Sequence, residues 1–207
     1  MKPNFRKRFF AWMMKKSDAT SDVLYGHYKE ELFSGVRGSV VEIGPGSGVN
    51  FKYLSSSIEW IGIEPNEAFH KDLLKKAKQE GIKAQLLQGD VLHIPLPDNY
   101  ADAIVCTLVL CSVTDTPKAI EEMKRVLKPG ARLCFIEHVA APKRTLLRLA
   151  QNVFNPMNRM IADGCNCNRE TWTYFQQGRF KHLELSHHKL KGTLPFFSPH
   201  VIGYGIK

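Results

Sequence analysis

Three glycines follow an apolar run in the stretch VVEIGPGSGVNF (residues 40–51), at positions 44, 46 and 48. Valine and isoleucine favour a β-strand, and closely spaced glycines allow the backbone after a strand to approach a ligand. A second strand-like run, EWIGIE, ends at Glu64, 20 residues after Gly44. A carboxylate at this distance can accept hydrogen bonds from the hydroxyls of a ribose. The spacing therefore predicts a nucleotide-containing cofactor at the ends of two neighbouring strands.

Two cofactor classes fit such a loop, a dinucleotide and S-adenosylmethionine. The dinucleotide fingerprint G-x-G-x-x-G needs its third glycine at position 49, where the chain has Val49. The observed pattern is E-x-G-x-G-x-G, from Glu42 to Gly48. A third strand-like run, LLQGD, ends at Asp90 and opens the pattern D-V-x-x-I-P. This pattern resembles the adenine-binding step of class I methyltransferases, and VLKPGARL (126–133) resembles the turn before their fifth strand. Together the motifs favour S-adenosylmethionine.

The resemblance to class I methyltransferases implies a role for each of these residues. Glu64 would hold the ribose, and Asp90 would accept a hydrogen bond from the adenine amino group. Gly44, Gly46 and Gly48 would let the backbone approach the methionine part of the donor, whose ammonium group Glu42 would help to hold. The predicted donor site is completed by Pro65, Val91, Thr107, Leu108 and Ser112.

A closer resemblance rests on motifs outside the generic fold, namely KEELFS (29–34), CTLVLCSV (106–113), EHVAA (137–141), DGCN with RETW (163–172) and the terminal PHVIGYGIK. Together they resemble the methyltransferase-like thiol S-methyltransferases, which implies methyl transfer to a small, apolar thiol. Relatives also include phospholipid and quinone-pathway methyltransferases, so those acceptors stay open. A noncatalytic protein of the same fold that binds lipid or a partner is the alternative from another class.

The acceptor side needs a group that orients or deprotonates the acceptor, because the donor itself supplies the reactivity in methyl transfer. His138 ends the fifth expected strand, on the side where such sheets bind ligands, and is the first candidate for a general base. Asp163, which follows a helix and precedes a glycine, is the second. Cys165 is interpreted as structural, because direct transfer needs no covalent intermediate. The pair Cys165 and Cys167 has no second pair to complete a zinc site, so no metal is expected.

Strand-like and helical segments alternate along the chain, which predicts an α/β fold with a doubly wound, mostly parallel, seven-stranded sheet. The last two strands lack a helix between them, so the last strand is expected to be antiparallel. We expect one methyltransferase domain at 35–207, preceded by a basic aromatic arm and a helix at 1–34. The expected strands are 39–44, 59–65, 83–90, 101–113, 131–139, 182–190 and 200–207. The main expected helices are 19–34, 66–81, 116–130 with Thr116 as its cap, 143–162 with a break at 155–156, and 169–178.

The basic charge is concentrated in the N-terminal arm. The chain of 207 residues has a net charge of +9, but residues 1–16 hold six cations and no acid, and without them 23 basic residues face 20 acidic ones. Nucleic acid is therefore not expected as a partner. Phe5, Phe9, Trp12 and Met13 share one face of a helix among these cations, which predicts reversible contact with an anionic membrane surface. The alternative is that the same aromatic residues pack over the cofactor site as a lid. No membrane span or signal peptide is expected, and free cysteines favour the cytoplasm.

Overall fold

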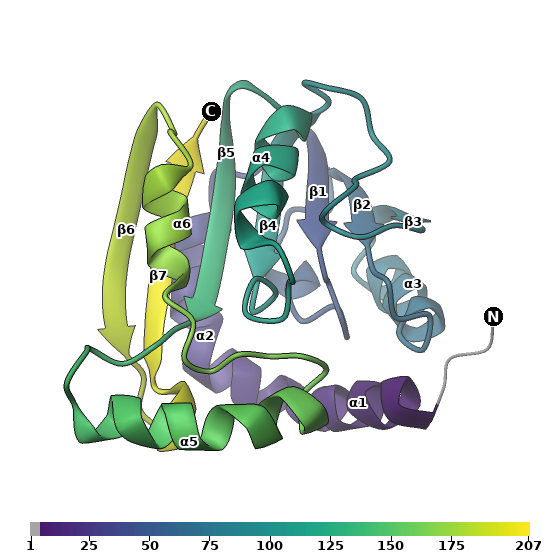
Figure 1. Ribbon diagram of the computed structural model, residues 1–207. Coiled ribbons are helices and arrows are strands. Elements are labelled where there is room, and N and C mark those ends of the chain that lie inside the picture. The colour runs from purple at the N-terminus through teal and green to yellow at the C-terminus, as the bar shows by residue number, and fades with distance from the viewer. Residues whose placement is uncertain (1–4) are drawn as a thin grey trace.

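The computed structural model describes residues 5–207, with side chains from residue 7 onward. Seven strands form one mixed sheet in the order β3-β2-β1-β4-β5-β7-β6 (Figure 1). β1 to β5 are parallel to their neighbours in this series, whereas β7 is antiparallel to both β5 and β6. The predicted doubly wound sheet is therefore confirmed. The strands are Ser39–Ile43 (β1), Glu59–Ile63 (β2), Lys83–Leu87 (β3), Ala101–Thr107 (β4), Leu127–His138 (β5), His182–Lys189 (β6) and Pro199–Ile206 (β7).

Helices cover both faces of the sheet, which explains why its central strands are apolar on both sides. One core cluster joins Tyr25 and Leu73 to Val40 of β1, and the other joins Ile120 and Phe175 to Ile104 of β4. The first face is therefore covered by α2 and α3 and the second by α4 and α6. The helices are Phe5–Lys16 (α1), Asp18–Phe33 (α2), His70–Gln79 (α3), Thr116–Val126 (α4), Leu146–Ile161 (α5) and Thr171–Gln177 (α6), with single 3-10 turns at Phe51–Tyr53 (η1) and Pro195–Phe197 (η2).

β4 is shorter than the apolar run predicted. The strand ends at Thr107, and Leu108 adopts a left-handed backbone conformation with φ of 58°. Oε1 of Glu137, at the end of β5, accepts hydrogen bonds from the backbone N–H groups of Val109 and Leu110, both at 2.9 Å. The expected strand 101–113 was therefore wrong after 107, because a buried carboxylate binds these N–H groups and turns the chain over the carboxyl edge of the sheet.

Two helix details also differ from the expectation. Asp115, not Thr116, caps α4, since its carboxylate accepts from the N–H of Lys118 at 3.1 Å. The Thr116 hydroxyl instead accepts from Arg169 at 2.8 Å. α5 continues through Pro156, where a break was expected.

The N-terminal helices lie at the carboxyl edge of the sheet, where β1, β2 and β4 end. α1 crosses the molecule at this edge, and α5 lies along the same edge further to the left in Figure 1. α2 contributes Tyr25, Leu32 and Phe33 to the core. The side chains of Lys2, Phe5 and Arg6, which belong to the predicted arm, lie outside the described residues. Within residues 5–207, no helix is long and apolar enough to cross a membrane.

Candidate active site

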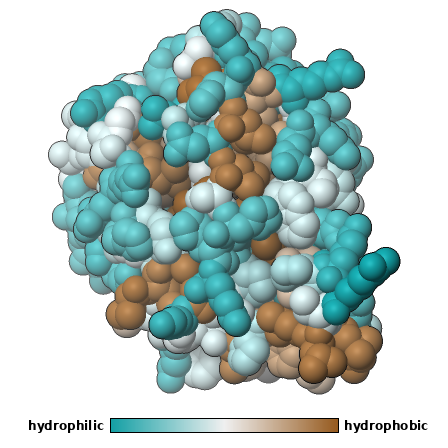
Figure 2. Space-filling view, turned by 90° about the vertical axis from the view of Figure 1, so that its left-hand side faces the viewer, coloured by the Kyte–Doolittle hydropathy of each residue, from teal (hydrophilic) through white to brown (hydrophobic). Residues whose placement is uncertain are grey.

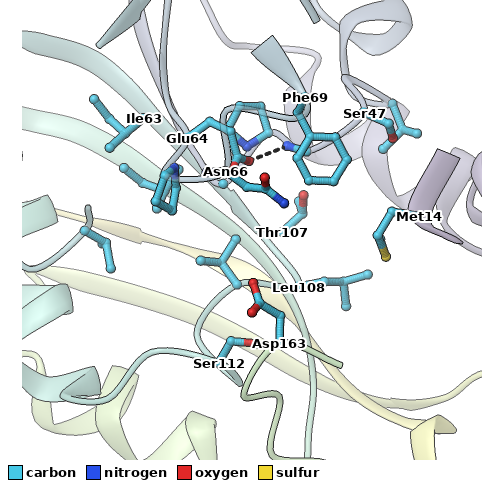
Figure 3. A pocket seen from close by; sticks show the side chains of 18 of the residues that line it. Met14, Ser47, Ile63, Glu64, Asn66, Phe69, Thr107, Leu108, Ser112 and Asp163 are labelled. Carbon is cyan, nitrogen blue, oxygen red and sulfur yellow. Dashed lines mark hydrogen bonds between the residues drawn. The ribbon is translucent and has the colours of Figure 1, made fainter. Parts of the chain in front are cut away.

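A cavity of about 370 Å³ lies between the carboxyl edge of the sheet and the helices α1 and α2 (Figure 3). It brings together residues from the ends of four strands, as expected where parallel strands end at one edge. The predicted residues that line it are Gly44, Gly46, Glu64, Pro65, Asp90, Val91, Thr107, Leu108, Ser112 and Asp163. Glu42, Gly48 and His138 are not among its lining residues.

Glu64 at the end of β2 is held in place by backbone groups. Oε2 accepts from the N–H of Gly46 at 3.0 Å, and Oε1 accepts from the N–H of Asn66 at 2.7 Å (Figure 3). The side chain is buried, and this burial raises the pKa of the carboxyl group above its ordinary value despite the two hydrogen bonds. Each carboxylate oxygen has a second lone pair, so the fixed group can still accept from ribose hydroxyls.

Each glycine of the loop after β1 has its own structural reason to lack a side chain. Gly44 has φ of 58°, and a Cβ there would lie 2.7 Å from Val109. Gly46 has φ of 54°, and a Cβ would meet nothing nearer than the carbonyl of Gly44 at 4.0 Å, which leaves open space for a ligand. A Cβ at Gly48 would press on Leu73 and Phe51 at 2.8 Å, so packing as well as its positive φ requires glycine there. Packing and backbone conformation therefore require glycine at 44 and 48, and only Gly46 faces open space in the cavity.

Glu42 lies beneath the cavity. Its oxygens accept from Asn50 Nδ2 at 2.7 Å and from Trp60 Nε1 at 2.8 Å. Burial raises the pKa of this carboxyl group. Asn50 also donates to the Thr107 hydroxyl at 3.0 Å. Glu42 therefore positions Thr107 through Asn50, and its predicted contact with the donor ammonium stays a prediction.

Lys29 on α2 lines the cavity, although the sequence did not single it out as a site residue. It is 2% exposed and donates to the Ser21 hydroxyl at 3.4 Å, and its ammonium faces the rings of Tyr25 and Tyr53. Among the described residues, no salt bridge involves it. Burial lowers the pKa of Lys29 to about 8, against the attraction of Glu42. The sequence feature that could have identified Lys29 is its spacing, four residues after Tyr25 and three before Leu32. This spacing places it on the apolar face of the helix.

α1 covers the cavity with one face. Phe10 and Met14 line it, and the ring of Phe10 packs edge-on against Phe69 at 6.5 Å. Asn66 fastens the helix by donating to the carbonyl of Lys7 at 3.1 Å. α1 therefore has the position of a lid over the donor half of the site.

The acceptor half faces Glu64 from the opposite wall. Asp163 has φ of 46°, in a turn completed by Gly164, and its carboxylate is directed into the cavity beside Ser112 (Figure 3). Leu108 and Ile136 add apolar surface. Asp163 is thus a turn residue whose carboxylate lines the cavity, and its role toward the acceptor stays a prediction.

His138 lies behind this wall. Its ring is buried, Nε2 is 3.1 Å from Sγ of Cys165, and the ring meets Phe197 edge-on at 5.3 Å. This geometry gives no support to a base acting on an acceptor in the cavity. Cys167 is directed elsewhere, toward the carbonyl of Gln151 at 3.7 Å and the side-chain oxygen of Asn155 at 3.6 Å. The two cysteines of the C-x-C pair therefore do not converge.

Glu137 is a further residue that the sequence did not single out. Its two hydrogen bonds to the loop after β4 set the position of Leu108 and Val109 in the cavity wall. Complete burial raises the pKa of Glu137 to about 7. The EHVAA motif contained this residue, but the adjacent histidine was the stronger candidate by residue type because it can titrate near neutrality.

Comparison with known proteins agrees with this geometry. A family model described as a methyltransferase domain matches residues 41–135. A SAM-dependent methyltransferase from Thermotoga maritima has the same fold, with a TM-score of 0.70 and 17% identity over 98% of both chains. Another from Aquifex aeolicus gives a TM-score of 0.63 and 18% identity, covering 95% of this chain and 97% of that chain. The chain thus has the fold of these S-adenosylmethionine-dependent methyltransferases.

Curated relatives narrow the family. Thiol S-methyltransferase TMT1A from Homo sapiens is 32% identical over 97% of this chain and 87% of its own length. Thiol S-methyltransferase TMT1B from Mus musculus is 33% identical over the same shares. A demethylmenaquinone methyltransferase from Roseiflexus castenholzii is 30% identical, over 68% of this chain and 59% of its own length. The chain belongs to the methyltransferase family that includes these thiol S-methyltransferases.

Proposed function

We propose that this enzyme transfers a methyl group from S-adenosylmethionine to the sulfur of a small, apolar thiol. The observation that carries the proposal is the carboxylate of Asp163, which faces the donor-binding residues across an apolar half-cavity. The thiol S-methyltransferases that match this chain over 87% of their length support the acceptor class. The quinone-pathway relative gives weaker support for a quinone acceptor, because the match covers only 59% of that protein.

Residues that follow β2 and β3, together with a residue of α2, would hold the cofactor in the donor half. Glu64 accepts from the ribose, Asp90 from the adenine amino group, and Lys29 pairs with the carboxylate of the methionine part. A buried ammonium without an ion-pair partner is destabilising, so a carboxylate ligand would offset this cost. The bound donor supplies a methyl group activated by a positively charged sulfur.

The acceptor half would orient and ionise the thiol. A free thiol has a pKa of about 8.5, so it is mostly protonated at neutral pH. Asp163 accepts the thiol proton, and the thiolate is then the nucleophile of an in-line displacement that leaves a thioether. Leu108, Ile136 and Phe10 exclude water around the reacting sulfur. This assigns the role of base to Asp163 in place of His138.

The test is donor consumption with a panel of small thiols, phospholipid amines and quinol precursors. The proposal expects turnover on thiols that grows with their apolar character. Turnover on quinols or amines alone would overturn the acceptor class and leave a methyltransferase. Calorimetry with S-adenosylhomocysteine distinguishes a methyltransferase of either acceptor class from a noncatalytic protein, because a noncatalytic protein need not bind this ligand.

We also propose that the enzyme docks on anionic membrane surfaces through α1 and α5. Phe9 and Trp12 on the outer face of α1 are 46% and 53% exposed and stack on each other. α5 exposes the stripe Leu146, Leu149, Val153, Met157 and Met160. Figure 2 shows apolar side chains in two groups near the lower edge of the molecule, with hydrophilic side chains between them. Neither helix contains an acidic residue.

Cosedimentation with vesicles of neutral lipid, with and without 30% anionic lipid, tests the docking. Each cation near an anionic surface contributes about 1 kcal/mol, and salt screens it. We expect binding only to the anionic vesicles, weakened by Val153→Glu and by 0.5 M salt. Val23→Glu is the matched control, because Val23 is 87% exposed on α2. Equal weakening by both variants would argue against a defined docking face.

A further inference from the structure

Three buried side chains converge behind the acceptor wall. Cys111 comes from the loop after β4, His138 from the end of β5 and Cys165 from the loop after α5. Their sulfur and ring-nitrogen atoms all lie within 4.8 Å of one another, and His138 Nε2 is 3.1 Å from Cys165 Sγ. The backbone holds the two loops together, since Asn166 donates from its N–H and its amide to the carbonyl of Cys111 at 2.9 and 3.0 Å.

The two thiols have opposite electrostatic environments. The Cys111 thiol and then the His138 ring lower the pKa of Cys165 well below that of a free thiol, against its burial. Sγ of Cys111 also lies 3.7 Å from the carbonyl oxygen of Leu108 and 3.7 Å from the Ser112 hydroxyl. The shared hydrogen bond with Cys165, and then burial, raise the pKa of Cys111. Burial alone would lower the pKa of His138, but the hydrogen bond and charge of Cys165 raise it. These shifts favour a thiolate at Cys165 over one at Cys111 and favour the charged form of His138.

Three further groups lie around the cluster and change the charge balance at His138. Glu137 attracts the His138 cation, Arg169 repels it, and His200 lies 6.4 Å from its ring. Nδ1 of His138 is buried without a partner in the described part of the chain. A zinc ion of the structural kind needs four ligands and a hydrogen-bond partner for the other nitrogen of its histidine, and the cluster provides three side chains. Thiol chemistry therefore fits the arrangement better.

We propose that Cys165 and Cys111 form a reversible peroxide-sensitive dithiol beside the active site, independent of methyl transfer. The Cys165 thiolate attacks a peroxide oxygen and breaks the O–O bond, forming a sulfenic acid, and the leaving hydroxide takes the proton of the His138 imidazolium to become water. The Cys111 sulfur then attacks the Cys165 sulfur and loses its proton. The S–O bond breaks and a second water leaves. Two thiols are oxidised and one peroxide is reduced.

Cys165 is 8% exposed and lies two residues after Asp163, which lines the cavity. Hydrogen peroxide is little larger than water, so it can reach a site that excludes bulkier oxidants. The neighbouring residues Ser112 and Asp163 both line the cavity. The disulfide would therefore join two segments of the acceptor wall.

The direct test is a peptide map of the full-length protein after one equivalent of hydrogen peroxide. We expect a mass loss of two hydrogens and a cross-link between the tryptic peptides that contain Cys111 and Cys165. Cys167 shares a tryptic peptide with Cys165, so Cys167→Ser is the matched control and should keep the cross-link. Cys111→Ser should abolish it and leave a sulfenic acid, measured as the mass of one added oxygen on the peptide that contains Cys165. A wild-type protein without this cross-link, or with oxidation spread over all five cysteines, overturns the proposal.

A pH profile of the oxidation rate tests the role of His138 as a positioning residue. The wild-type rate should be nearly constant from pH 5.5 to 8, because the thiolate is already formed. In His138→Gln the Cys165 thiolate keeps the Cys111 contact but loses the imidazolium, so the rate at pH 5.5 should fall below that of the wild type and rise with pH. Identical pH profiles of the two proteins would show that His138 does not stabilise the Cys165 thiolate. Dithiothreitol should restore the reduced form of both the wild type and His138→Gln.

Discussion

Replacing Lys29 with methionine tests whether this buried ammonium binds the donor carboxylate. The two side chains have similar lengths, so the substitution preserves packing in a position that is 2% exposed. A hydrogen bond to a charged group contributes about 1.5–3 kcal/mol, which corresponds to roughly 10–150-fold weaker donor binding. The stability of the protein should rise or stay unchanged, because the substitution also removes a poorly solvated charge.

The affinity of the wild-type protein should depend on pH through this group. The pKa of Lys29 is lowered to about 8 in the free enzyme, and a bound carboxylate would raise it by favouring the charged form. Donor affinity should therefore be constant below pH 8 and fall by up to tenfold per pH unit above it. In Lys29→Met this fall should disappear.

The assay is calorimetry with S-adenosylhomocysteine and with methylthioadenosine, which lacks the amino acid group. Lys29→Met should weaken the first and leave the second unchanged. Equal losses for both ligands would refute the carboxylate contact and indicate a general disturbance of the cavity. Unchanged binding of both ligands, with reduced turnover on thiols, would instead place the ammonium beside the acceptor.

Further substitutions address three carboxylates of the site. Glu64→Ala should weaken S-adenosylhomocysteine binding by about 1.5–3 kcal/mol and Glu64→Gln by less, since Gln keeps an acceptor oxygen; unchanged affinity in a folded Glu64→Ala protein would remove the ribose contact. Asp163→Asn should lower turnover on thiols roughly 100-fold at neutral pH with normal donor binding, and the deficit should shrink toward pH 8.5 as the thiol ionises unaided; a pH-independent deficit would contradict its role as a base. Glu137 has its folded-state pKa raised to about 7, so its protonated form stabilises the protein fully below the unfolded pKa, and this contribution is lost as pH rises through 7. Denaturant unfolding at pH 5 and 8.5 should show that Glu137→Gln reduces this loss by up to about 3 kcal/mol; an unchanged pH dependence would refute the assignment.

The fold and the donor half of the site were predictable from local patterns. The alternation of apolar strands and helices specifies a parallel sheet, and parallel strands place their carboxyl ends at one edge. Residues that directly follow a strand, such as Gly44, Gly46, Glu64 and Asp90, therefore reach that edge whatever the rest of the chain does. Their spacing in sequence was enough to bring them to the cavity.

The acceptor half depended on tertiary structure. Successive residues of a strand point to opposite faces. In β5, Glu137 therefore points to the loop after β4 and His138 points toward Cys165. No local sequence pattern indicates which of these two residues contacts a ligand. The rotation of α2 about its axis decides that Lys29 enters the cavity. Cys111 and Cys165 are 54 residues apart in the sequence, and they meet only because the loops after β4 and α5 pack against each other. The sequence alone determined the donor-binding edge, whereas long-range packing determined the acceptor wall and the thiol pair behind it.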